Sequence, residues 1–233
     1  TAAIPRGIPP GDPWLWPGAW PRQSLGWDWL QALDLEIAVG IDQLRAGSQA
    51  LGPARMAAVL DNGAIAVRDL DMPLASGRLT GVVTLEGVPP QGILGADLRL
   101  GGARLERLAA LSAPGSDVEG SLDIDASLVG RGRSIAEIVA SLAGSGRLSL
   151  QDTALPMADG LPGHHRGNIA GSFAVDRGIL RSDPPGLEVT SRDASGGLHL
   201  TLDLASWLLD ARIDLGGGQR RLLGPPGRTS SLP

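Results

Sequence analysis

Apolar and polar residues alternate with a period of two along most of the chain. Between Leu33 and Asp42, leucine, isoleucine and valine occupy every second position, and Asp34, Glu36 and Asp42 lie on the other face. Such alternation is typical of a half-buried β-strand, because successive side chains of a strand point to opposite faces. The same pattern predicts further strands at residues 55–60, 64–70, 78–86, 93–100, 121–128, 147–151, 169–175, 187–190, 198–204 and 207–215, with another starting at residue 179.

Short turn sequences separate many of these predicted strands. Asp61-Asn62-Gly63 and Asp176-Arg177-Gly178 are strong signals for tight turns between antiparallel strands. Parallel strands would require a crossover helix after each strand, and the spacing leaves no room for one. The sequence therefore predicts an antiparallel meander.

The period changes to that of a helix between residues 135 and 142, where apolar residues recur at i, i+3, i+4 and i+7. Ser134 stands at the N-cap position and Glu137 follows three residues later, so the pair is predicted to form a capping box. Gly144 is predicted to end the helix in a left-handed conformation. A second short helix is predicted at residues 103–111.

The predicted strands carry more apolar surface than two or three short helices can cover. A second sheet could cover it in a β-sandwich. Alternatively, one long curled sheet could form a trough whose apolar face holds a ligand, and an acyl chain there would gain about 0.8 kcal/mol per buried CH₂. Alternation does not choose between the two. In a trough, the lining residues would be Leu35, Ile37, Val39, Ile41, Val83, Leu85, Leu98, Leu100, Leu122, Ile124, Leu128, Leu148, Leu150, Phe173, Val175, Leu200 and Leu202.

Composition narrows the class of protein. The 233 residues include 34 glycines and 18 prolines but only 3% aromatic residues, so the core of this turn-rich β protein must be aliphatic. A net charge of −5 without a dense Lys/Arg run argues against a nucleic-acid partner. The absence of cysteine excludes disulfides and thiolate metal sites. The sequence contains no run of about 18 apolar residues, so no membrane-spanning helix is predicted.

Residues that could carry catalysis are few. His164 and His165 are adjacent in a Pro/Gly loop, and His199 lies on the polar side of a predicted strand. Asp123 and Asp125 could form an acid/base or cation-binding pair, but their spacing places both on the outward face of one strand. No nucleophile elbow, phosphate loop or zinc motif is present. We therefore expect no enzyme activity, cofactor or metal site.

The chain divides into three parts by composition. Residues 1–26 are rich in Pro and Gly around Trp14, Trp16 and Trp20, which predicts an irregular entry segment. Its tryptophans either cover an open sheet end or lie at a membrane interface. Residues 27–215 hold the predicted strands, and residues 216–233 are predicted to be a flexible tail.

One stretch resembles a known family. Residues 120–152, GSLDIDASLVGRGRSIAEIVASLAGSGRLSLQD, combine a strand, a G-x-G-x-S turn, a short helix and a G-x-L-x-L strand followed by an acidic residue. This order resembles the C-terminal region of the AsmA family, large envelope proteins of Gram-negative bacteria. The Trp and Pro at residues 20–21 and the strand pair from residue 169 also resemble that family.

The resemblance implies a β-groove related to bridge-like lipid carriers. It implies a periplasmic protein anchored in the inner membrane by an upstream helix that this chain lacks. It also implies phospholipid as the partner and a role in lipid transport or outer-membrane assembly. A structural domain that binds other envelope proteins through exposed sheet edges is the alternative.

Overall fold

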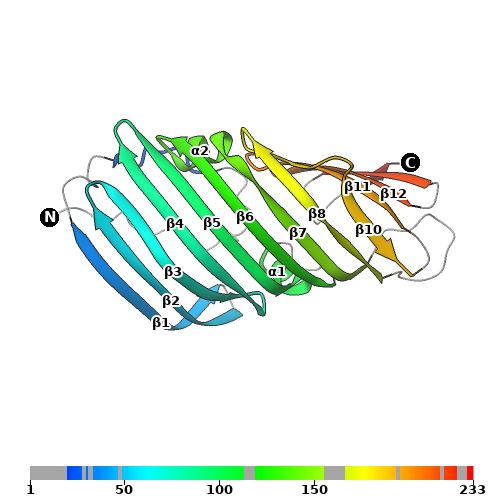
Figure 1. The fold of residues 1–233 in the computed structure, drawn as a ribbon, viewed down its shortest axis with the longest axis horizontal. Coiled ribbons are helices and arrows are strands. Elements are labelled where there is room, and N and C mark those ends of the chain that lie inside the picture. Colours follow the sequence, from blue (N-terminus) through cyan, green and yellow to red (C-terminus); the bar gives the residue numbers. More distant parts are fainter. Residues whose placement is uncertain are drawn as a thin grey trace.

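A computed structural model describes residues 20–27, 30, 34–46, 49–112, 119–154, 166–192, 195–215, 218–224 and 230–232. All fourteen strands within these residues belong to one antiparallel sheet (Figure 1). The first eight strands are β1 (Leu35–Ala46), β2 (Gln49–Asp61), β3 (Ala64–Leu74), β4 (Gly77–Val88), β5 (Gln91–Arg104), β6 (Ser121–Gly132), β7 (Ala143–Ala154) and β8 (Arg166–Asp176). The others are β9 (Ile179–Ser182), β10 (Leu187–Ser191), β11 (Ser195–Asp203), β12 (Leu208–Leu215), β13 (Gly218–Gly224) and β14 (Ser230–Leu232).

The strands follow the chain as a meander. Each strand from β1 to β8 pairs with its successor in sequence, as the short turns predict. Strands β9 and β10 share one place in the strand order, between β8 and β11. β9 pairs with the end of β8, β10 pairs with the start of β8, and both pair with β11. The prediction of a mainly β, curled antiparallel sheet is confirmed, and the described strands do not divide into the two sheets of a sandwich.

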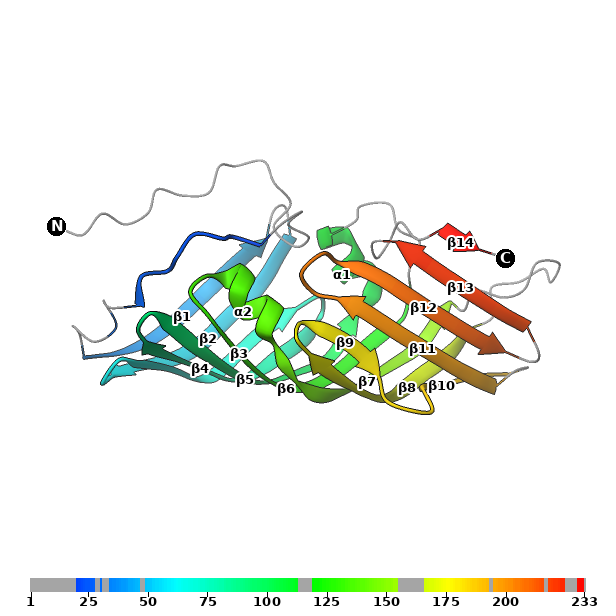
Figure 2. The same ribbon diagram turned by 90° about the horizontal axis from the view of Figure 1, so that it is seen from above.

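Seen from above the view of Figure 1, the sheet is strongly curved (Figure 2). The strands from β1 to β8 form its floor, and β11, β12 and β13 turn upward at one end. Helices α1 (Leu105–Ser112) and α2 (Ile135–Ser141) both lie on the concave side. The molecule is therefore a trough whose concave side carries two short helices.

The start of α2 follows the sequence prediction in part. Ser134 is the N-cap, and its Oγ accepts a hydrogen bond from the backbone N–H of Glu137 at 3.2 Å. The predicted return bond is different, because the Glu137 carboxylate accepts from the backbone N–H of Arg133 at 2.8 Å rather than from Ser134. The helix thus has a cap at its start that includes the residue before the N-cap.

The predicted role of Gly144 is wrong. The cap at the end of α2 is Leu142, with φ of −53°, and Gly144 lies within β7. Gly144 has φ of +152°, and a Cβ there would lie 2.1 Å from the carbonyl oxygen of Ser127 on β6. The glycine is needed for the close approach of two strands, and not to end the helix.

The predicted flexible tail at residues 216–233 also needs correction. Residues 218–224 form β13 against β12, and residues 230–232 form β14 against β13. A segment that follows an edge strand can pair with its free backbone groups whatever its own side-chain pattern. Because this pairing uses backbone groups, the alternation of side chains could not reveal it.

Candidate functional site

The apolar residues of the sheet form rows that cross many strands on the concave face. Backbone pairing aligns Ile37 with Ala58, Val67, Val83, Ala96 and Leu128 in one such row. A neighbouring row joins Leu100, Ile124 and Leu148. Because paired residues point to the same face, register and alternation together place all the predicted lining residues on one side of the sheet.

On the side of the sheet where α2 lies, the apolar face of β2 to β6 is covered by the segment before β1. Trp27 and Leu30 are almost fully buried and pack with Leu60 and with Ile138 of α2. The indole N–H of Trp27 also donates to the carbonyl oxygen of Gly132 at 3.1 Å. The predicted lining residue Leu85 packs against this cluster, and so belongs to a closed part of the core.

Glycines make room for that cover. A Cβ at Gly92 would lie 2.6 Å from the Trp27 ring, and a Cβ at Gly87 would lie 2.9 Å from Leu30 Cδ1. Gly92 pairs with Gly87 on β4 and with Gly132 on β6, so these three glycines lie side by side on three strands. We call them the glycine seat. Sequence reasoning missed this seat, because Trp27 and these glycines are far apart in the chain.

The upturned end of the sheet closes on itself. Ile169, Leu187, Val189 and Ile213 form a buried cluster from β8, β10 and β12. Leu148, Leu150, Leu198, Leu200 and Leu215 pack around it. Phe173 and Val175 of β8 are also buried, and the Phe173 ring lies over Gly146. Of the predicted lining residues, this end therefore buries Phe173 and Val175 and packs Leu148, Leu150 and Leu200.

Outside these two packed regions, the apolar face is less covered. The predicted lining residues Val83, Leu98, Leu100, Leu122, Ile124 and Leu128 are all half-buried. Val39, Ile41 and Leu202 are half-buried too, whereas Leu35 and Ile37 on the edge strand are 49% and 42% exposed. The middle of the concave face and the β1 edge are thus the parts of this surface still open to a ligand.

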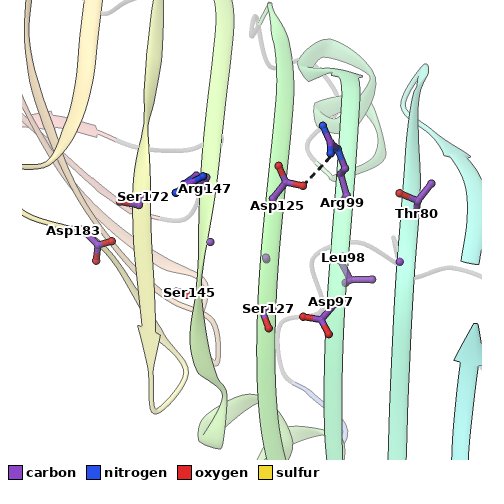
Figure 3. Close-up of a pocket in the computed structure, with 13 residues that line it drawn as sticks. Thr80, Asp97, Leu98, Arg99, Asp125, Ser127, Ser145, Arg147, Ser172 and Asp183 are labelled. Carbon is purple, nitrogen blue, oxygen red and sulfur yellow. Dashed lines mark ion pairs between the residues drawn. The ribbon is translucent and has the colours of Figure 1, made fainter.

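The opposite face is polar and holds a shallow hollow of about 600 Å³ (Figure 3). Backbone pairing sets Thr80, Arg99, Asp125, Arg147 and Ser172 in one row across five strands. Arg99 and Asp125 form an ion pair of 3.5 Å between exposed side chains. Alternating charges of this kind keep the outer face hydrated, and an exposed ion pair contributes little stability.

The polar residues considered for catalysis do not converge. Asp123 Oδ1 accepts a hydrogen bond from the backbone N–H of Gly102 at 2.8 Å, and Asp125 faces Arg99 on the outer surface. His199 is exposed on β11, while His164 and His165 lie outside the described residues. Within the described ranges, no three metal-ligating side chains come together.

Glu137 is the titratable group with the clearest local cause of a shift. Its side-chain hydrogen bond with Arg133 lowers the pKa of the Glu137 carboxyl, and the Arg133 backbone N–H adds to the effect. The Arg133 guanidinium lies 2.9 Å from Glu137 Oε1, one helical turn away. This pair stabilises the start of α2, so its role is structural.

Comparison with known proteins identifies one family. The AsmA family model matches residues 18–182, a range that contains the segment before β1, both helices and the strands from β1 to β9. No curated protein and no solved structure matches the chain significantly. Among the described residues, no helix has the length and hydropathy that a membrane crossing requires.

Proposed function

Because the chain belongs to the AsmA family of bacterial envelope proteins, we propose that its concave face shields phospholipid acyl chains from water. The protein would act as one stretch of a groove that carries lipid between membranes and so supports outer-membrane assembly. This function involves no covalent chemistry and no cofactor. We further propose that it acts in the periplasm and that the full-length protein is anchored in the inner membrane.

The observation that carries the proposal is the incomplete cover of the apolar face outside its two packed regions. Val83, Leu98 and Ile124 point to the concave side but remain half-buried. Full burial of such a side chain is worth about 1.5–3 kcal/mol. An acyl chain laid along these rows would supply the missing contacts and would lose its own contact with water.

The polar outer face also favours the concave side as the place for a lipid tail. Its Arg, Asp, Ser and Thr side chains alternate across strands and keep that side hydrated, so only the concave side suits a lipid tail. The strands of β4 to β7 contain 12 to 14 residues. At about 3.3 Å per residue, strands of this length span roughly 40 Å before curvature, which is ample width to wrap an acyl chain.

Two neighbouring valines of β4 provide a matched test. Val83 is half-buried on the concave face, whereas Val82 is exposed on the outer face. We expect Val83→Asp to reduce binding of a fluorescent phospholipid by at least about tenfold, since a charge opposes a lipid tail. Val82→Asp should bind as the wild type does. Native mass spectrometry of the gently purified wild type should detect bound phospholipid.

A second variant separates lipid binding from folding. Val83→Trp adds bulk without charge and should obstruct the face while the far-UV circular dichroism stays that of a folded sheet. The proposal is wrong if no phospholipid binds to the wild type, or if folded Val83 variants bind as well as the Val82 variant.

A second candidate function rests on the β1 edge. Leu35 and Ile37 are exposed on a strand that pairs on one side only among the described strands, and such an edge can accept a strand from another protein. On this alternative the chain is a scaffold for envelope proteins. Ile37→Lys should then abolish capture of envelope proteins, whereas Val83→Asp, three strands away from the edge, should leave that capture intact.

A further inference from the structure

A cavity of about 540 Å³ lies between α2 and the β11–β12 turn. Figure 2 shows these two elements next to each other on the concave side of the sheet. Small residues make the room for it: Ala136 and Ala140 belong to α2, and Ala205 belongs to the turn. The volume is typical of a site for a small molecule or for part of a larger one.

The cavity lies on the face of α2 that points away from the sheet. Ala136 and Ala140 stand two positions before and after Ile138, so the helical period places them on the opposite face from that residue. Ile138 packs on the sheet, where a Cβ at Gly130 would lie 3.1 Å from Ile138 Cγ2. Because α2 rests on the concave face, its opposite side and the cavity belong to the inside of the trough.

A circuit of hydrogen bonds fixes the elements around the cavity. The first turn of α2 donates a backbone N–H to the carbonyl oxygen of Pro21 at 3.0 Å, and the Trp20 indole N–H donates to that of Leu204 at 2.7 Å. The Leu204 N–H donates to Gly178, and the Gly178 N–H donates to Leu142 at the end of α2, both at 2.9 Å. The cavity is therefore formed before any ligand binds, which lowers the cost of binding.

Trp20 forms an aromatic wall of this cavity. Its ring lies against that of Trp207, with 5.7 Å between the two centroids, and its N–H is already bound to Leu204. The indole therefore offers apolar surface to a ligand, as the three alanines do. This part of the cavity suits the carbon atoms of a ligand and not its charges.

Three polar side chains that line the cavity are bound within the protein. The Ser134 Oγ accepts the Glu137 N–H at 3.2 Å, and the Glu137 carboxylate pairs with Arg133 at 2.9 Å. The Ser206 side chain is hydrogen-bonded to the Asp203 carboxylate, which also accepts the Ser206 N–H at 3.2 Å. A charged ligand must therefore be held by another group.

Arg22 is that group. It lines the cavity and is exposed, and within the part of the chain that the structure describes its guanidinium forms no ion pair. Because Arg133 balances Glu137, Arg22 leaves the cavity with a surplus of one positive charge. A guanidinium binds a phosphate through two parallel hydrogen bonds. One positive charge matches a phosphate diester, which carries one negative charge.

We propose that this cavity binds the phosphate diester of a phospholipid whose acyl chains lie on the concave face. Arg22 binds the phosphate, and Trp20 and the alanines pack against the carbon atoms next to it. The site rests on the function proposed above and adds the place and the chemistry of the lipid's polar end. α2 separates the cavity from the floor of the trough by one helix diameter, about 10 Å, which is shorter than an extended acyl chain.

Titration calorimetry with two lipids tests this site. They are a short-chain phosphatidylcholine below its micelle concentration and the diacylglycerol with the same chains, which lacks the phosphate. We expect Arg22→Gln to weaken binding of the phosphatidylcholine about fivefold or more and to change binding of the diacylglycerol less than about twofold. Arg147→Gln is the matched control, because Arg147 is exposed on the outer face, and it should bind both lipids as the wild type does.

A second variant tests the cavity without a change of charge. Ala140→Leu adds bulk inside it, and leucine is a good helix former, so α2 should remain intact. It should weaken binding of the phosphatidylcholine about fivefold or more as well. Arg22, Ala140 and Arg147 are all exposed, so the variants should keep the wild-type unfolding midpoint in urea.

Soluble competitors distinguish a lipid headgroup from free phosphate. Glycerophosphocholine should displace the phosphatidylcholine at lower concentration than inorganic phosphate does, because only the former carries carbon atoms for the Trp20 wall. Equal competition by the two would contradict the assignment to a lipid.

The site is wrong if Arg22→Gln weakens both lipids alike, or weakens the phosphatidylcholine no more than Arg147→Gln does. In either case the shielding of acyl chains would still stand, provided that Val83→Asp reduces binding of both lipids. If the wild type binds neither lipid, the proposed function itself is wrong, and this site with it.

Discussion

At the scale of single residues, glycines determine which parts of the chain can approach the sheet. A Cβ at Gly132 would lie 2.5 Å from Glu137 Cβ and 2.6 Å from the backbone nitrogen of Ile138. At Gly130, a Cβ would lie 2.9 Å from the Ile138 carbonyl oxygen. The two glycines of the Gly-Arg-Gly sequence therefore allow α2 to pack directly on the end of β6.

Gly132→Ala should consequently destabilise the protein. The added methyl group meets the backbone of α2, which must shift, and overpacking of this kind costs about 1–3 kcal/mol. Gly197→Ala is the control, because a Cβ there has no atom within 4 Å. It should change the free energy of unfolding by less than about 0.5 kcal/mol. Urea unfolding of both variants measures the difference, and equal stabilities would contradict this account of Gly132.

Alternation in the sequence predicted the direction of individual side chains but not their surroundings. The inward residues of β4, β5 and β6 were identified because a strand has a fixed period. The glycine seat under Trp27 could not be predicted in this way, because the need for a missing Cβ depends on an atom from a distant segment. The same limit explains why Gly144 was assigned to the helix end instead of to a close contact between strands.

At the scale of elements, α2 depends on the polar contacts at its start. Ser134 is almost fully buried and caps Glu137, and Glu137 in turn binds the backbone and the guanidinium of Arg133. The helix has only 7 residues, so its own hydrogen bonds contribute little and its packing and caps must stabilise it. Ile138 and Val139 are its buried residues.

Glu137→Gln should lower stability in a pH-dependent way. Folding lowers the pKa of the Glu137 carboxyl, chiefly through its hydrogen bond with Arg133. Its contribution is therefore present above the unfolded-state pKa and is lost as the pH falls through the folded-state pKa. The variant should be less stable than the wild type at pH 7, and the difference should shrink toward about pH 3.

Urea unfolding of both proteins at the two pH values measures this effect. Glu36→Gln is a suitable control, since Glu36 is exposed on β1. A difference between wild type and Glu137→Gln that stays constant from neutral to acidic pH would contradict the role of the ionised carboxylate.

The order of the helices and strands could be predicted from the sequence better than the pairing of the last strands. Tight turns such as Asp61-Asn62-Gly63 identified the β2–β3 hairpin, and the position of α2 followed from its apolar spacing. The pairing of β13 and β14 did not, because it depends on the free edge of β12. The shared position of β9 and β10 also required knowledge of both neighbouring strands.

At the scale of the whole molecule, burial is concentrated in the two packed clusters. Leu187 and Val189 of β10 are completely buried in one cluster, and Leu30 is completely buried in the other. Among the described strands, edge strand β1 has a neighbour on one side only, and its Leu35 and Ile37 remain exposed. Opening of the sheet should therefore begin at β1.

Amide hydrogen exchange should reveal this gradient. Backbone amides of β10 should exchange at least about tenfold more slowly than those of β1, because local opening of a poorly packed edge costs less free energy. Bound phospholipid should further protect β4, β5 and β6, which carry the middle of the concave face. Equal protection of β1 and β10 would contradict the proposed distribution of stability.

Among the described strands β1 pairs on one side only, and this edge bears on the length of the trough. Every strand in this antiparallel sheet repeats the same spacing, about 4.8 Å from its neighbour, so a further strand joined to β1 would lengthen the trough by that increment. Its apolar residues would extend the existing rows if it kept the alternating pattern. In the groove proposed above, the number of strands alone would therefore set the length of the path, without a new fold.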